Sequence, residues 1–189
     1  MRPTATTSDF PRLVSLACHD LRTPLATVHG FAKTILRQEG IDETTARWLG
    51  MIDAATEELV DLLDQLSIAA RIESDRYEPV TREADSLELA RAAVPEATGE
   101  GAPIQVDVEV VERSLAALAR AASRHGGVEV AVGVRGAQIE IAPVVPDAAP
   151  IVLGEELKDL GAAVAVRCVR ALGGSVELDG ERLVVTLPS

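Results

Sequence analysis

The sequence of 189 residues contains very few aromatic side chains: two Phe, one Trp and one Tyr, together 2% of the chain. Hydrophobic residues nevertheless make up 47% and charged residues 25%, a balance typical of a globular chain and not of a disordered one. Any core must therefore be built from Leu, Val, Ile and Ala. A chain of this length has room for one medium domain or two small ones.

Basic residues are also scarce. The chain has 18 Lys and Arg against 30 Asp and Glu, which gives a formal net charge of −12. A nucleic-acid-binding protein needs Lys and Arg to neutralise phosphates, and an anionic membrane surface attracts the same cations. We therefore predict no nucleic acid and no membrane as partners.

Long apolar runs and paired cysteines are missing as well. Cys18 and Cys168 lie far apart in the sequence and do not have the spacing of metal ligands. We therefore interpret both as small buried residues of a protein in a reducing cytosol. No window reaches the ~18 apolar residues of a membrane span. The opening MRPTATTSDF lacks the apolar core of a signal peptide. We expect a soluble, cytoplasmic protein.

What the first third of the chain does contain is two seven-residue apolar repeats. The first consists of Val14, Cys18, Leu21, Leu25, Val28, Ala32 and Ile35, and the second of Trp48, Ile52, Ala55, Leu59, Leu62, Leu66 and Ala69. Apolar residues spaced alternately three and four positions apart are typical of helices that pair through one apolar stripe. Each predicted helix has about 30 residues and is roughly 45 Å long. The short connection QEGID predicts an antiparallel hairpin.

The ends of these helices carry recognisable signals. Ser8 or Asp9 can cap the first helix, Gly40 lies where it should stop, and Asp42 or Thr44 can cap the second. Two helices alone leave much apolar surface exposed, so we predict a homodimeric four-helix bundle. The alternative is that the hairpin packs on the rest of its own chain.

After the polar stretch ESDRYEPVTRE, interpreted as a linker, the pattern changes. We predict a helical-hairpin domain at residues 1–74 and an α+β sandwich at residues 75–189, with one sheet and helices on one face. Its expected elements are the helix LELARAAV, the strand PIQVDVEV, the helix VERSLAALARAASRH, a hairpin of GVEVAVGV and AQIEIAPVV around Arg135-Gly136, the helix EELKDLGAAVAVRCVRAL, and a last hairpin of SVEL and RLVVTL around Asp179-Gly180.

The stretch SLACHDLRTPL, residues 15 to 25, holds the clearest candidate chemistry. His19 follows Cys18 of the apolar repeat and shares a face with Thr23, one turn later, so we expect both to point out of the bundle. An exposed neutral imidazole is a competent nucleophile, and Asp20 can hold one ring N–H while the other nitrogen stays free. Pro24 offers no N–H to the carbonyl of Asp20 and should bend or loosen the helix. On the residues alone, an exposed helical His is usually an ordinary surface residue.

The seven residues HDLRTPL resemble the phosphoacceptor box of bacterial two-component sensor histidine kinases. The resemblance implies that His19 accepts a phosphoryl group, that Asp20 assists proton transfer and that Thr23 aligns water for dephosphorylation of a partner. It also implies a homodimeric bundle and a response-regulator receiver domain as partner. The closing ALGGSVELDGERLVVTLPS resembles the end of the ATP-binding sandwich of that family.

The nucleotide motifs of the family are degenerate here. Its pattern N-L-L-x-N-A holds Mg²⁺ through Asn, whereas this chain has ALARAA, with Ala117 and Ala121 at the two Asn positions. Alanine offers no oxygen to a magnesium ion. The pattern D-x-G-x-G is also missing, and Asp147 is the only carboxylate near its place.

The third motif, G-x-G-L, lets backbone amides at a helix start approach phosphates. Here the matching residues begin at Asp159, and only Gly161 remains. Asp159 adds a negative charge where phosphates would lie. We infer that this domain does not use ATP as the family does. The alternative is a wrong alignment, or a divergent site that recruits other groups.

These observations predict a two-component phosphoprotein that acts as a histidine phosphotransferase in a phosphorelay. His19 would exchange phosphate with receiver aspartates, with no ATP, metal or cofactor of its own, because the receiver supplies Mg²⁺. This resembles dimeric histidine phosphotransfer proteins with a degenerate ATPase-like domain. One alternative is an active sensor-type histidine kinase with a divergent ATP site. Another is a non-catalytic dimeric scaffold or receiver-binding inhibitor.

Other polar residues receive plainer interpretations. His29 is taken as an ordinary helix-surface or edge residue, and His125 as a cation at a helix end, where it suits the helix dipole. Arg22 is interpreted as a surface contact for an acidic receiver, or else as the partner of a nearby Asp or Glu.

Overall fold

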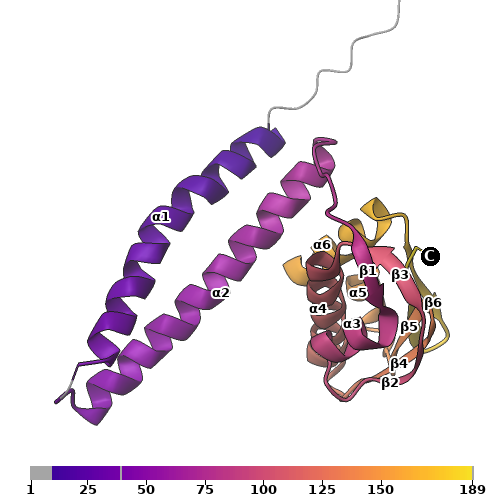
Figure 1. The fold of residues 1–189 in the computed structure, drawn as a ribbon. Coiled ribbons are helices and arrows are strands. Elements are labelled where there is room, and N and C mark those ends of the chain that lie inside the picture. The colour runs from indigo at the N-terminus through magenta and orange to yellow at the C-terminus, as the bar shows by residue number, and fades with distance from the viewer. Residues whose placement is uncertain (1–9, 39, 189) are drawn as a thin grey trace, which may run out of the picture. The chain divides into compact units, whose positions relative to one another are not determined.

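The computed structural model describes residues 10–38 and 40–188 and divides the chain into two compact units, Met1–Asp75 and Arg76–Ser189 (Figure 1). The caps predicted at Ser8 and Asp9 lie outside the described residues. Among the helices that are described, none combines the length and apolar character that crossing a membrane requires.

The first unit is the predicted helical hairpin, made of α1 (Phe10–Leu36) and α2 (Glu43–Glu73). The chain turns at Gly40, whose backbone φ of 87° is rarely adopted by residues that have a Cβ. Asp42 is the cap of α2: its carboxylate accepts hydrogen bonds from the Thr45 amide at 2.9 Å and the Thr45 hydroxyl at 2.6 Å. The hydroxyl contact, followed by the amide contact, lowers the pKa of Asp42.

The two helices do not meet through the two predicted repeats. The shielded row of α1 consists of Ser15, Cys18, Arg22, Leu25, His29, Ala32 and Leu36, and that of α2 of Leu49, Asp53, Thr56, Val60, Leu63, Ser67 and Ala70. Both rows keep the steps of three and four. The predicted α2 repeat was wrong as the hairpin seam, because its members Trp48, Ile52 and Leu59 are 58%, 44% and 48% exposed.

Polar pairs between the helices explain this shift. Arg22 donates to Asp64 across the hairpin at 2.6 Å, and His29 approaches Asp53 at 3.1 Å. Turning α2 to bring the apolar row onto α1 would break both pairs and leave half-buried charges without partners, which is costly. The predicted α1 repeat is therefore divided, with Cys18 buried and Leu21 exposed.

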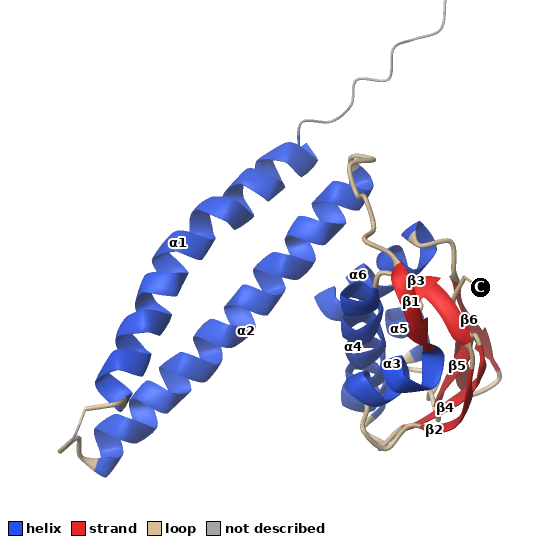
Figure 2. Cartoon of the chain, in the orientation of Figure 1, coloured by secondary structure: helices blue, strands red, loops and turns tan. Residues whose placement is uncertain are grey.

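The second unit is an α+β domain with helices on one face of a mixed sheet (Figure 2). Its helices are α3 (Ser86–Ala93), α4 (Val108–Gly126), α5 (Ala149–Val152) and α6 (Leu160–Ala171). Its strands are β1 (Arg82–Asp85), β2 (Thr98–Gly101), β3 (Pro103–Val106), β4 (Ala131–Gly136), β5 (Gln138–Ala142), β6 (Ser175–Asp179) and β7 (Arg182–Thr186). The five-stranded sheet has the order β2-β4-β5-β7-β6, and β1 pairs with β3 apart from it.

The two predicted hairpins, β4–β5 and β6–β7, are confirmed, with glycines of positive φ at Gly136 and Gly180. All sheet neighbours are antiparallel except β2 and β4. The apolar core is aliphatic, as the composition requires, and its largest fully buried side chains include Ile104, Leu115, Leu118, Ile139, Ile141 and Leu183.

Two predicted elements are cut short by an aspartate that caps a helix. The strand expected at PIQVDVEV ends at Val106, because Asp107 caps α4. The Asp107 carboxylate also accepts from the Tyr77 hydroxyl at 3.3 Å and the Val80 amide at 3.1 Å, so it holds part of the predicted linker. The helix expected from Glu155 begins only at Leu160, after the cap Asp159. Three short elements, β1, β2 and α5, were not predicted.

Ser86 gives a test of how this unit is held together. Its fully buried hydroxyl donates to the Gly136 carbonyl at 2.7 Å and accepts from the Ala102 amide at 2.9 Å. Ser86→Ala would leave both backbone groups without a partner, and we expect it to lower the free energy of unfolding by about 1–3 kcal/mol.

Ser123→Ala is the matched control for urea unfolding of this unit. Ser123 is half-buried and gives one hydrogen bond, to the Val128 carbonyl at 2.7 Å, so its loss should cost less. An equal or smaller cost for Ser86→Ala would contradict this account.

Candidate functional site: an exposed histidine on the first helix

His19 lies in the middle of the first half of α1, with its side chain 78% exposed. Its neighbour Cys18 is only 2% exposed and lies in the shielded row. Successive helical residues are about 100° apart around the axis, so burying one side chain turns the next toward solvent. The imidazole therefore has the exposure that the sequence predicts.

Asp20 contacts the ring of His19 from the adjacent position. The Nδ1 atom of His19 and the Oδ1 atom of Asp20 are 3.1 Å apart, and the Asp20 side chain is 68% exposed. When Nδ1 carries the proton, it donates to this carboxylate, and the lone pair of Nε2 is left to face an incoming electrophile. A carboxylate in this place can also receive the Nδ1 proton as the ring becomes cationic.

Thr23 and Pro24 lie one turn further along, and both are exposed. The Thr23 carbonyl accepts from the Thr27 hydroxyl at 3.1 Å. Pro24 removes the amide that would bond to the Asp20 carbonyl. The helix nevertheless runs through Pro24 without ending, from Phe10 to Leu36.

The cysteine beside His19 does not compete with it as a nucleophile. Burial raises the pKa of the Cys18 thiol, an effect that Arg22 opposes and Asp64 reinforces. The reactive thiolate is therefore scarcer at neutral pH than for an ordinary exposed cysteine. The imidazole is the accessible nucleophile of this turn.

Arg22 is held by the hairpin. Its guanidinium donates to Asp64 of α2 at 2.6 Å, with side-chain exposures of 41% and 26%. Of the two interpretations from the sequence, pairing with a nearby acidic residue is the one that the structure supports. Arg22 stands three residues after His19, and its pair with Asp64 fixes the side of α1 that faces α2.

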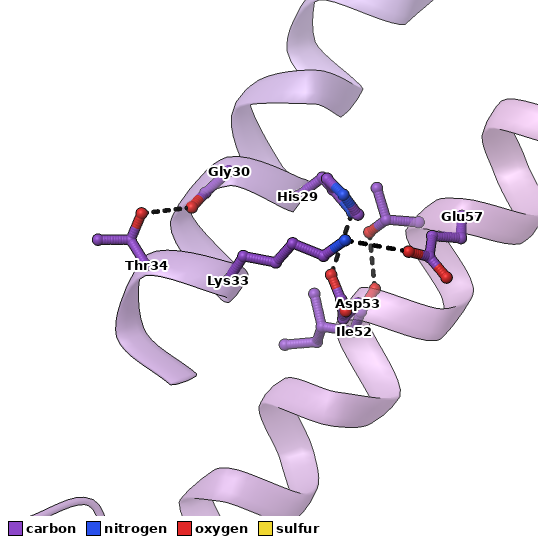
Figure 3. Close-up of polar contacts among 8 residues, drawn as sticks. His29, Gly30, Lys33, Thr34, Ile52, Asp53 and Glu57 are labelled. Atoms are coloured by element: carbon purple, nitrogen blue, oxygen red, sulfur yellow. Dashed lines mark hydrogen bonds and ion pairs between the residues drawn. The ribbon is translucent and has the colours of Figure 1, made fainter. Parts of the chain in front are cut away.

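The sequence reasoning missed the surroundings of His29. This residue is half-buried against α2, with Nδ1 at 3.1 Å from Asp53 Oδ1, and Glu57 and Lys33 lie beside it (Figure 3). The signal was present in the sequence: His29 stands seven residues after Arg22, so both fall in one row of a seven-residue repeat.

In the second unit, Asp159 occupies the start of α6. Its Oδ1 accepts from the Ala162 amide at 3.0 Å, and its Oδ2 lies 3.2 Å from His125 Nε2 and 3.5 Å from Arg124 Nη1. The side chain is 11% exposed. A helix N-terminus attracts anions, and here the chain supplies its own carboxylate. Gly161 follows within the first turn of α6.

The residues predicted at the other two motif positions lie in different surroundings. Ala117 and Ala121 are buried in α4, 6% and 1% exposed, and belong to the apolar core. Their methyl groups carry no atom that could bind a metal ion. Asp147, after β5, is exposed.

Residues 12–75 match the family model described as "His Kinase A (phospho-acceptor) domain". The match spans His19 and both helices of the hairpin. The hairpin, about a third of the chain, is thus similar to the phospho-acceptor domain of histidine kinases. A curated relative is the sensor protein kinase PmrB of Pseudomonas aeruginosa, 36% identical over 91 residues, which cover 44% of this chain and 19% of that protein. The aligned part is thus about a fifth of the relative's length.

Two solved structures share the fold. Full-length ShkA in complex with AMPPNP superposes with a TM-score of 0.69 at 21% identity, over 94% of this chain and 46% of that one. The Acinetobacter baumannii histidine kinase AdeS superposes with a TM-score of 0.52 at 19% identity, over 89% of this chain and 95% of that one. At these identities the likeness concerns the fold, which is a helical hairpin followed by an ATPase-like α+β domain.

The contact between His19 and Asp20 predicts a tautomer. Because the carboxylate accepts from Nδ1–H, we expect the Nδ1–H form of His19 to be enriched over that of an unassisted exposed histidine. Nitrogen–proton correlation spectra of the imidazole measure the two forms.

Asp20→Asn should lower the Nδ1–H fraction of His19, and Glu58→Gln, an exposed substitution on α2, should leave it unchanged. An unchanged tautomer ratio in Asp20→Asn would show that the contact does not orient the ring.

Proposed function

We propose that this chain is a histidine phosphotransferase of a phosphorelay. His19 receives a phosphoryl group from the aspartyl phosphate of one response-regulator receiver domain and passes it to another. The observation that carries the proposal is the pairing of an exposed imidazole with Asp20 at 3.1 Å, in a unit that matches the phospho-acceptor domain.

The transfer follows from ordinary acyl-phosphate chemistry. The Nε2 lone pair of His19 attacks phosphorus and forms an N–P bond, while the P–O bond to the receiver aspartate breaks and the aspartate leaves as a carboxylate. The ring then carries positive charge, which the Asp20 carboxylate at Nδ1 stabilises. Receiver domains contribute the Mg²⁺ in this proposal, so the bundle only has to present the ring. Thr23, on the same exposed face, is the candidate for holding a water near the modified histidine.

Three residues of the second unit favour an external phosphate source over ATP. Asp159 caps α6 with a carboxylate at the place where the family motif would hold phosphates. Two unit charges of like sign about 4 Å apart repel by about 1–4 kcal/mol between the dielectric of water and that near a protein surface. Ala117 and Ala121 bring no metal-binding atom to the motif that holds Mg²⁺ in the family.

The second candidate function is an ATP-dependent histidine kinase with a divergent site. It is favoured by one observation: the solved ShkA complex, which holds AMPPNP, shares the fold over 94% of this chain. At 21% identity this likeness concerns the fold alone, and the Asp159 cap weighs against nucleotide phosphates at α6.

Parallel labelling separates the two functions. The full chain is incubated with a 32P-phosphorylated receiver domain in one reaction and with γ-labelled ATP and Mg²⁺ in another. We expect label on the chain only in the first reaction, as an acid-labile and alkali-stable phosphoramidate. Labelling from ATP alone would contradict the proposal.

His19→Gln should abolish the label, and His125→Gln, the matched control in the second unit, should retain it. Thr23→Ala should accept phosphate at a similar rate but lose it to water more slowly. Label that persists in His19→Gln would place the acceptor elsewhere.

We also propose that the chain acts as a homodimer through the apolar stripe of α2, defined by Trp48, Ile52, Leu59 and Leu66. These side chains are 36% to 58% exposed, and α1 exposes Leu21, Val28 and Ile35 at seven-residue intervals. An exposed stripe of large apolar side chains at this spacing is typical of a bundle interface.

Leu59→Lys tests the dimer by placing a charge in the stripe. Sedimentation analysis should show the mass falling from twice 19.9 kDa to that of one chain. Asp61→Lys, an exposed α2 position turned about 160° from Leu59, is the matched control and should remain dimeric. A dimeric Leu59→Lys variant, or a monomeric unaltered chain, would overturn this interface.

A further inference from the structure

His29, Asp53 and Glu57 bring three potential metal ligands together between α1 and α2. One ligand atom from each lies within 4.8 Å of the other two. Figure 3 shows the imidazole on α1 and the two carboxylates on α2 pointing toward one another. Asp53 and Glu57 are four residues apart and so share one face of α2. The cluster lies ten residues after His19, roughly 15 Å along α1.

Two of these ligand atoms, from His29 and Asp53, face each other without a hydrogen bond. His29 Nδ1 and Asp53 Oδ1 lie 3.1 Å apart, both are shielded from solvent, and neither has a hydrogen-bond partner among the described residues. Buried polar atoms without a partner are uncommon and costly. Two ligands of a tetrahedral ion with bonds of about 2.0–2.2 Å lie roughly 3.3–3.6 Å apart. A small opening of this contact would therefore admit an ion between the two atoms.

A cation already lies at the edge of the cluster. Lys33 Nζ is 3.1 Å from Glu57 Oε1, and the two side chains are 40% and 60% exposed. An exposed ammonium–carboxylate pair is weak and its lysine stem is flexible, so it can give way to a stronger ligand. Lys33 is thus the internal competitor for Glu57.

We propose that His29, Asp53 and Glu57 form a binding site for a divalent transition-metal ion of the zinc type, which links α1 to α2. One imidazole and two carboxylates suit zinc and its first-row neighbours, whereas Mg²⁺ and Ca²⁺ prefer oxygen ligands alone. Three protein ligands leave a fourth position for water. The Glu57 carboxylate reaches the ion when it releases Lys33.

The site does not depend on the proposed phosphotransfer. It requires neither His19 nor a receiver domain. Because the ion would bond to both helices, it would hold them together and stabilise the folded hairpin by mass action. Zinc should therefore raise the temperature at which the circular dichroism signal of the helices is lost, and His29→Gln should abolish that shift.

Calorimetric titration of the full chain with Zn²⁺ tests the proposal, with Co²⁺ absorption as a second readout of the ligand geometry. We expect one ion per chain. Removing a ligand in His29→Gln or Asp53→Asn should weaken binding at least about tenfold, since even the loss of an outer-shell partner commonly costs 10–100-fold. Lys33→Met should tighten binding, because it frees Glu57.

His125→Gln and His19→Gln are the matched controls, since each removes a histidine that contacts an aspartate outside the cluster. Both should bind zinc as the unaltered chain does. Circular dichroism verifies that each variant keeps its helices, and the gain expected for Lys33→Met cannot arise from misfolding. Absence of zinc binding in both the unaltered chain and Lys33→Met would overturn the proposal, and so would equal affinity in His29→Gln.

Discussion

The rotational setting of α1 against α2 is the constraint on which the rest of the first unit depends. Arg22 pairs with Asp64 at 2.6 Å and His29 meets Asp53 at 3.1 Å, so the shielded row of α1 is partly polar. With that row turned inward, His19 is turned outward. The same setting leaves Trp48, Ile52, Leu59 and Leu66 of α2 exposed. The polar pairs thus present both the candidate phosphoacceptor and the stripe proposed for dimerisation.

Polar pairs in this position do more for specificity than for stability. Each is partly exposed, and such pairs contribute about 0–1 kcal/mol. A different rotation of α2 against α1, however, would separate half-buried charges from their partners across the hairpin. That separation costs more free energy than the correct pairing contributes. Small residues such as Cys18, Ala32 and Ala70 occupy the buried positions of the same rows.

The sequence predicted the hairpin, the two antiparallel strand pairs and the outward position of His19, because each rests on a local pattern. Apolar period and turn glycines decide these features within a few residues. It did not predict which of two parallel rows on α2 faces α1, since both rows have the same period and the choice depends on cross-helix partners. For that reason His29 was interpreted as an ordinary surface residue. The sequence analysis also missed the end of β3 and the start of α6, where Asp107 and Asp159 act as helix caps.

The second unit has the fold of an ATPase-like domain, and the residues predicted to stand at its nucleotide-motif positions have structural contacts. Ala117 and Ala121 pack into the aliphatic core, and Asp159 satisfies the first turn of α6 with its own carboxylate. A phosphoryl group on His19 would then have to come from outside the chain, which is the central claim of this account. Calorimetric titration of the full chain with ATP and Mg²⁺ tests it most directly. The account predicts no saturable heat, and a saturable heat at micromolar nucleotide would contradict it.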